Sequence, residues 1–240
     1  MNTGKAVSPQ ALVFDVFGTV VDWRSALIED ASAFGSVRGI ETDWVAFVDA
    51  WKAGYRPGMD AVREGRRPWA NVEALYLERF EEIAAEFGLH NLDPAARTAL
   101  VRLWRRSRPW PDAVPGLTRL KRRYVISTLS NGDVAMLVEM ARRGGLPWDT
   151  VLCAEIFRTY KPDPKVYLGA AELLADTPQE VMLVACHNYD LRAARSHGLS
   201  TAFIRGRREF GDDQRHDQEP EEDWDLVADD IEDLAGKLGC

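Results

Sequence analysis

The sequence contains few cysteines, and none of them are clustered. Its 240 residues include three, Cys153, Cys186 and Cys240, which are widely separated. An odd number of cysteines without a Cys-x-x-Cys motif is typical neither of a disulfide framework nor of a zinc site. We therefore expect reduced thiols and a cytoplasmic location.

Long apolar runs and an excess of basic residues are also missing. The run Ala11 to Phe14 is far too short to cross a bilayer, and residues 1–5 lack the pattern of an export signal. The net charge of -8 argues against a nucleic-acid partner, which usually requires a basic face. We predict no membrane or nucleic-acid partner. A small anionic substrate is still compatible, because a local cationic pocket can outweigh the global charge.

Short apolar runs alternate with helical patterns over much of the chain. With 46% apolar and 28% charged residues, the composition is that of an ordinary globular protein. Turn residues bound five strand-like runs, and helical periodicity lies between the later ones. This alternation predicts an α/β fold with a Rossmann-like parallel sheet. The predicted strands are Ala11–Asp15, Tyr124–Leu129, Val151–Ala154, Val181–Cys186 and Thr201–Ile204.

The region from Trp23 to about Pro111 has helical periodicity almost throughout. One apolar stripe, for example, contains Trp44, Phe47, Val48, Trp51 and Tyr55. No strand signal of comparable strength occurs there. We predict an inserted all-helical cap domain over residues 23–111, and a core formed by residues 1–22 and 112–240. The dense mixture of charges over 205–223 predicts a solvated loop.

Polar residues follow four of the predicted strands. They are Asp15, the turn 130–132, Lys161 and the segment 187–190. Ligands of an open parallel sheet bind outside the carboxyl ends of its strands, so these residues should converge. Taken singly, each has an ordinary structural role as a turn residue, a helix cap or a solvated lysine. Their occurrence after four successive strands favours a functional site.

These residues form four motifs, and their order along the chain matches that of a known family. The motifs are Asp15-Val16-Phe17-Gly18-Thr19, Leu129-Ser130-Asn131-Gly132, Tyr160-Lys161-Pro162-Asp163 and the late Asp190. They resemble the haloacid dehalogenase superfamily, and their details resemble its (S)-2-haloacid dehalogenase type II branch. The resemblance covers nearly the whole chain, including the position of the helical cap.

Phe17 decides between the branches of this superfamily. Most members resemble phosphatases, whose first motif is Asp-x-Asp and which use Mg2+, but here Phe17 lies two residues after Asp15. The fourth motif also lacks the paired acids that would help to hold magnesium. A halide leaves as a stable anion and needs no general acid. The resemblance thus implies hydrolysis of short 2-haloacids, with no metal and no cofactor.

The resemblance also implies roles for individual residues. Asp15 displaces halide at C2 of the substrate and forms an ester, which water then hydrolyses. Lys161 keeps Asp15 ionised, and Thr19 steadies the nucleophile loop. Tyr167 aligns with a tyrosine that the family places near Lys161.

The substrate carboxylate needs a separate binding site. Ser130 and the backbone N–H groups of Val16, Phe17 and Asn131 are the candidates, because charged acceptors form the stronger hydrogen bonds. Asn131 is also a candidate for the halide side.

Two positions depart from the family pattern. The family places a Trp-Arg pair on an early cap helix for halide binding, whereas this chain has Trp51-Lys52. Lys52 is our candidate, against a snorkelling surface lysine or a role for Arg56 or Arg63.

The second departure is His187, which aligns with an asparagine in the fourth motif. It could orient or deprotonate the hydrolytic water, with Asp190 setting its tautomer or charge. Alternatively, His187 merely satisfies the turn.

Two other functions compete with dehalogenation. A Mg-dependent phosphatase of the same fold is disfavoured by Phe17. A non-catalytic binding protein would use the cap groove, with the acidic segment 217–225 as a contact surface. A homodimer is left open, because helical caps often present apolar surface.

Overall fold

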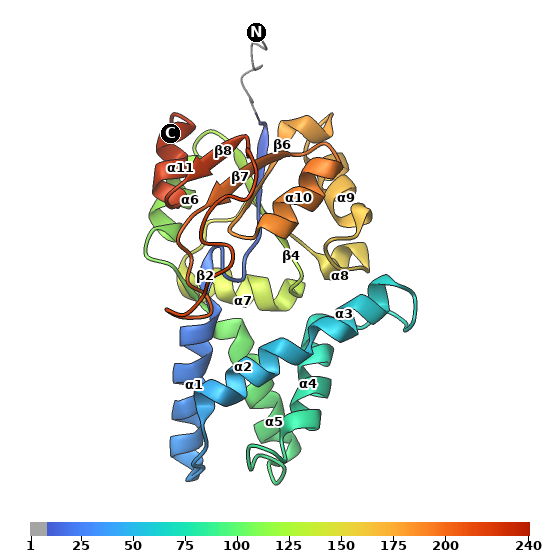
Figure 1. Cartoon of the computed structure of the whole chain (residues 1–240), viewed down its shortest axis with the longest axis vertical. Helices are drawn as coiled ribbons and strands as arrows, with labels where there is room; N and C mark the ends of the chain where they lie inside the picture. Colours follow the sequence, from blue (N-terminus) through green and yellow to red (C-terminus); the bar gives the residue numbers. More distant parts are fainter. Residues whose placement is uncertain (1–8) are drawn as a thin grey trace.

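Six parallel strands form the central sheet of the computed structural model, which describes residues 9–240 (Figure 1). Their spatial order is β5-β4-β1-β6-β7-β8, and every neighbouring pair is parallel. This architecture confirms the predicted α/β fold. The strands are β1 (Ala11–Phe14), β4 (Val125–Ser130), β5 (Thr150–Cys153), β6 (Val181–Ala185), β7 (Ser200–Ile204) and β8 (Leu226–Ala228).

Helices cover both faces of this sheet. All four side chains of β1 are fully buried, which explains why this strand is a continuous apolar run rather than an alternating one. Leu12 and Phe14 pack with α6, α7 and α11, whereas Ala11 and Val13 pack with α9 and α10. The core helices are α6 (Ala113–Leu120), α7 (Val134–Gly144), α8 (Ala154–Phe157), α9 (Pro164–Leu174), the 3-10 turn η2 (Pro178–Glu180), α10 (Asn188–Ser196) and α11 (Ile231–Lys237).

A helical insertion follows β1 and lies beyond the carboxyl ends of the strands (Figure 1). It therefore covers the edge of the sheet at which the polar motifs converge. Its elements are α1 (Trp23–Arg38), α2 (Trp44–Gly54), α3 (Arg56–Arg63), α4 (Val72–Ile83), α5 (Pro94–Val101) and the 3-10 helix η1 (Arg102–Arg106). Within residues 9–240, no helix combines the length and apolar content needed to span a lipid bilayer.

Besides its helices, the insertion contains one short strand that the sequence did not predict. A short strand, β3 (Arg108–Pro109), pairs antiparallel with β2 (Val21–Asp22) and joins the start of the insertion to its end. Two-residue strands are too short to produce a periodic signal, so the sequence pattern could not reveal them. Strand β8, with three residues, is also too short for such a signal and was not predicted.

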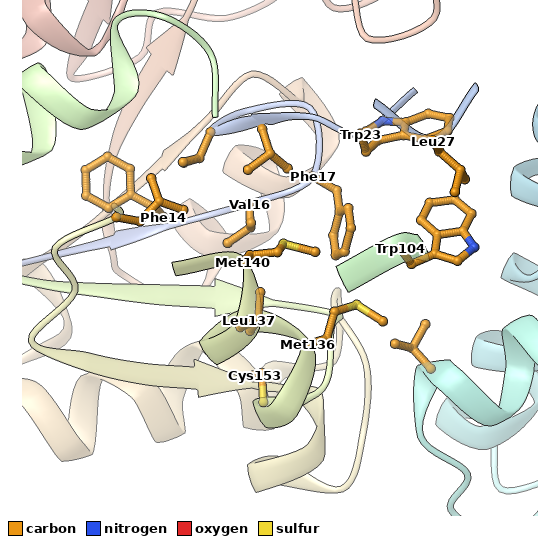
Figure 2. Packing of buried hydrophobic residues seen from close by; sticks show 14 of the residues in the cluster. Phe14, Val16, Phe17, Trp23, Leu27, Trp104, Met136, Leu137, Met140 and Cys153 are labelled. Carbon is orange, nitrogen blue, oxygen red and sulfur yellow. The ribbon is translucent and has the colours of Figure 1, made fainter. Parts of the chain in front are cut away.

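Trp104 connects the insertion to the loop that follows β1. Its ring stacks on Tyr76 at a centroid distance of 4.1 Å and on Trp23 at 5.5 Å. Phe17, from the loop after β1, meets the Trp104 ring edge-on at 6.3 Å. Figure 2 shows Phe17 and Trp104 close to Met136 of α7. The aromatic cluster thus holds the helical insertion against the carboxyl edge of the sheet.

We expect Trp104→Ala to lower the free energy of unfolding by about 3–5 kcal/mol, because the substitution leaves a cavity among stacked rings. Val37 of α1, whose side chain is 83% exposed, provides the control. Val37→Ala should change stability by less than about 0.5 kcal/mol. Urea denaturation measures both variants, and equal stabilities would contradict the importance of this cluster.

Candidate active site

The first motif forms a tight loop at the end of β1. The backbone N–H groups of Val20 and Val21 both donate to the carbonyl of Val16, at 2.9 and 3.1 Å. Gly18 has φ of 87°, a conformation that L side chains rarely adopt. The Thr19 hydroxyl donates to Asp15 Oδ2 at 2.9 Å and accepts the Cys186 N–H at 3.0 Å. These bonds fix the Asp15 carboxylate at the sheet edge.

Lys161 lies between two carboxylates. Its Nζ is 2.8 Å from Asp15 Oδ1 and also donates to the Asp190 carboxylate. The Tyr167 hydroxyl donates to the other Asp190 oxygen at 2.7 Å. The side-chain oxygen of Asn131 accepts the Lys161 backbone N–H at 2.7 Å. Residues from four separate motifs therefore meet in one hydrogen-bonded network, as the order of the strands predicted.

This network keeps Asp15 ionised. Burial alone would raise the pKa of its carboxyl group, but the Lys161 charge and the His187 hydrogen bond together hold this pKa well below its usual range. The pKa of Lys161 is correspondingly raised, because the Asp15 and Asp190 charges outweigh the effect of burial. At neutral pH the site thus contains an anionic Asp15 beside a cationic Lys161.

His187 bridges Asp15 and a residue that the sequence analysis missed. Its Nδ1 is 3.1 Å from Asp15 Oδ2, and its Nε2 is 2.6 Å from Glu209 Oε1. Burial opposes a charge on the ring, but the carboxylates of Glu209 and Asp15 raise the pKa of His187 well above its ordinary value. With a carboxylate at each nitrogen, both nitrogens donate, and the ring is an imidazolium. His187 therefore does more than satisfy a turn.

Two expectations about this region were wrong. Asp190 does not set the tautomer or charge of His187 through a hydrogen bond, because its carboxylate accepts from Lys161 and Tyr167. The carboxylate that contacts His187 Nε2 belongs to Glu209. The segment 205–223 is not simply a solvated loop. Three of its polar side chains are buried, namely Arg207, Glu209 and Gln214.

A run of charges does not reveal which of its members are paired inside the protein. Arg207 forms a bidentate pair with Asp112, at 2.8 and 2.6 Å, and thereby brings the segment to the site. The one available sequence signal was Phe210, the single Phe, Tyr or Trp in this charged stretch.

A cavity of about 500 Å³ opens beside Asp15, between the core and the insertion. Its walls combine carboxylates, cations and aromatic rings, so it could hold a small anionic molecule. The lining residues are Asp15, Phe17, Asp49, Lys52, Ala53, Tyr55, Arg56, Asn131, His187, Tyr189, Glu209, Phe210, His216 and Asp217.

Lys52 directs its ammonium into this cavity rather than into solvent. Its Nζ donates to the Tyr55 hydroxyl at 3.1 Å and lies 4.5 Å from the Trp23 ring centroid. Despite burial, its pKa is raised by Tyr55, Glu209 and Asp15. Of the alternative cations, Arg56 also lines the cavity, whereas Arg63 pairs with Asp60 at 3.0 Å and does not.

Some of the predicted substrate-binding residues line the cavity and others do not. Phe17 and Asn131 line the cavity, but Ser130 and Val16 lie behind its wall, with exposures of 0% and 1%. The Ser130 hydroxyl accepts the Gly132 N–H at 3.1 Å. The binding roles of all these residues remain predictions.

The side chains present do not suit a metal ion. Among residues 9–240, one cluster of three side chains has the spacing of metal ligands: Cys186, His187 and Glu209. However, His187 Nε2 and Glu209 Oε1 are bonded to each other, and burial raises the pKa of the Cys186 thiol. Between Asp15 and Asp190, positive charge is supplied by Lys161.

Known proteins resemble this chain over most of its length. The family model for haloacid dehalogenase-like hydrolases matches residues 9–198. The (S)-2-haloacid dehalogenase 4A of Burkholderia cepacia is 27% identical over 208 residues, spanning 82% of this chain and 83% of that protein.

Two solved structures are more similar. The crystal structure of an L-2-haloacid dehalogenase has 49% identity and a TM-score of 0.93, covering 96% of this chain and 99% of that one. A defluorinating L-2-haloacid dehalogenase has 43% identity and a TM-score of 0.93, with 97% and 96% covered.

The depressed pKa of Asp15 predicts a pH-dependent contribution to stability. Because the folded-state pKa lies below the unfolded value of 3.8, the contribution is present above that value and is lost as the pH falls. The stability difference between wild type and Asp15→Asn should therefore change below about pH 4. Urea unfolding from pH 3 to 7 measures it. Asp212→Asn, at an exposed carboxylate outside this network, is the control variant.

Proposed function

Because the chain belongs to the haloacid dehalogenase-like hydrolase family, we propose that it is a hydrolytic (S)-2-haloacid dehalogenase. It releases halide from short 2-haloacids and yields 2-hydroxy acids. The observation that carries this proposal is the ionised Asp15, paired with Lys161 and followed at Phe17 by a ring where phosphatases have an acid. The L-2-haloacid dehalogenases with 49% and 43% identity support this proposal and its stereochemistry.

In the first step, an Asp15 oxygen attacks C2 from the side opposite the halide. The C2–halogen bond breaks, the configuration at C2 inverts, and an ester links Asp15 to the substrate. Lys161 and Thr19 orient the carboxylate, because each donates a hydrogen bond to one of its oxygens. Phe17 excludes water from the attacking group, which favours displacement.

The substrate carboxylate and the halide require separate binding groups. The backbone N–H groups of Phe17 and Asn131, which line the cavity, bind the carboxylate, and Asn131 also borders the halide. Ser130 and Val16 lie behind these two residues and support that wall. Lys52 receives the departing halide. An ammonium among aromatic rings has little water around it, so its attraction for an anion is strengthened.

In the second step, water attacks the carbonyl carbon of the Asp15 ester. His187 is in contact with Asp15 and is the candidate base for this water. Asp190 and Tyr167 keep Lys161 in place through their own hydrogen bonds. Hydrolysis restores Asp15 and releases the 2-hydroxy acid, and neither a metal nor a cofactor takes part.

The organisation of the chain fits this chemistry. The insertion over 23–111 acts as the cap domain, and 1–22 with 112–240 form the core, of which residues 1–8 lie outside the described part. The enzyme acts in the cytoplasm on a small molecule, and it can form a homodimer. Two acids of the segment 217–225 are used in contacts within the protein. Asp217 accepts the Asn188 N–H at 2.8 Å, and Asp225 accepts the Thr201 hydroxyl at 2.8 Å.

We expect halide release from (S)-2-chloropropionate and none above background for Asp15→Asn, because only Asp15 provides the nucleophile. The assay contains EDTA, and fluoroacetate is included because one relative is defluorinating. No halide from any substrate, or phosphate release that EDTA abolishes, would overturn the proposed function.

Lys52→Met should lower kcat/KM by about 100-fold, as when one preorganised electrostatic donor is removed. Lys237→Met serves as the control, since Lys237 lies in α11 and pairs with Asp233. Steady-state halide release measures both variants. A larger loss for Arg56→Met than for Lys52→Met would assign halide binding to Arg56 instead.

A further inference from the structure

Glu209 lies buried in the loop between β7 and β8, with only 3% of its surface exposed. One carboxylate oxygen, Oε1, is 2.6 Å from His187 Nε2. The other, Oε2, accepts the indole N–H of Trp23 at 2.5 Å. Both oxygens are therefore engaged, and the carboxylate is held in a single orientation against the imidazole.

The loop after β1 is shaped around this carboxylate. A Cβ at Gly18 would overlap the Glu209 carboxylate, so a side chain there is excluded on steric grounds as well as by its backbone conformation. Two residues before Glu209, the Arg207 guanidinium donates to the Thr19 carbonyl at 3.1 Å and pairs with Asp112. Glu209 is thus anchored to the same loop that carries the nucleophile.

We propose that Glu209 is a positioning residue for hydrolysis of the Asp15 ester. It holds His187 with the Nε2 proton directed toward Glu209, so that Nδ1 faces Asp15 and takes a proton from the attacking water. This inference rests on the proposed function and assigns a residue to its second step. An acid that fixes the tautomer of a catalytic histidine is a recurrent arrangement in hydrolases.

The protons balance over the cycle. Asp15 forms the ester, and the halide leaves. The Nδ1 proton of His187 then passes to solvent as well. Neutral His187 then takes a proton from water, and hydroxide attacks the Asp15 carbonyl carbon. The bond from this carbon to the substrate oxygen breaks, and the new Asp15 carboxylic acid protonates the departing alkoxide. Asp15 is again a carboxylate and His187 again an imidazolium, and the net products are hydroxy acid, halide and one proton.

The surroundings of His187 explain why its proton becomes mobile at this stage. Ester formation removes the negative charge of Asp15, one of the groups that stabilise the imidazolium. Glu209 stays anionic and retains the Nε2 proton. Other titratable or charged groups face the ring, its cavity or Asp15, and none of them loses charge in the reaction: Cys186, Tyr189, Lys161, Lys52, Tyr55, Asp49, Arg56, His216 and Asp217.

Glu209→Gln should slow ester hydrolysis while leaving ester formation intact. Rapid mixing with (S)-2-chloropropionate should give a burst of about one halide per active site, followed by steady-state release at least about tenfold slower than wild type. The peptide that contains Asp15 should then carry the mass of the bound acid. Glu219→Gln, in the same loop but with an exposed side chain, is the control and should match wild type.

A spectroscopic measurement tests the positioning without substrate. In nitrogen-15 histidine spectra, with His187 assigned from His187→Asn, Glu209→Gln should lower the pKa of His187 by about one unit or more. Glu209→Asp retains the charge and should restore part of both the pKa and the hydrolysis rate.

The outcomes separate the two proposals. Wild type without halide release overturns the proposed function. Halide release by wild type, together with slow turnover of Glu209→Gln but no accumulated ester, overturns the role of Glu209 in the second step. An unchanged His187 pKa in both Glu209 variants overturns the positioning.

Discussion

The pairing of buried charges at the carboxyl end of β1 is the constraint on which the rest of the site depends. Asp15 is 7% exposed and Asp190 fully buried, and Lys161 lies between them. Removing one partner of a buried pair costs about 3–5 kcal/mol, because the other charge is left without compensation. The same pairing provides an ionised nucleophile, so Lys161 both stabilises the buried carboxylates and keeps Asp15 ready to react.

The pairing of opposite charges continues from Lys161 to the cavity. The acids Asp15, Asp190 and Glu209 face the cations Lys161, His187 and Lys52, so neighbouring charges alternate in sign. Glu209 lies within reach of both His187 and Lys52, which together keep its pKa low despite burial. Such a site changes its total charge when Asp15 becomes an ester. The surplus positive charge appears at the moment when a halide ion needs stabilising.

The sequence predicted those parts of the site that follow from strand order. Asp15, Lys161 and Asp190 lie at the ends of predicted strands or in the segments that follow them, and parallel topology brings such residues to one edge. Glu209 could not be found in this way. It lies in a loop without periodicity, and its burial depends on the distant contact between Arg207 and Asp112. The pair β2–β3 was missed because two residues carry no repeat.

Lys52 of the insertion and Phe17 of the core line the same cavity. Phe17 comes from the core loop and Lys52 from α2, and the Lys52 ammonium lies 5.6 Å from the Phe17 ring. Trp23 and Trp104 surround the same ammonium at 4.5 and 5.9 Å, so aromatic faces replace much of the water that a lysine normally holds. A cation in this setting retains its charge because Glu209 and Asp15 lie nearby. The aromatic cluster that stabilises the insertion therefore also shapes the electrostatics of the cavity, and a change in its packing alters the chemistry as well as the fold.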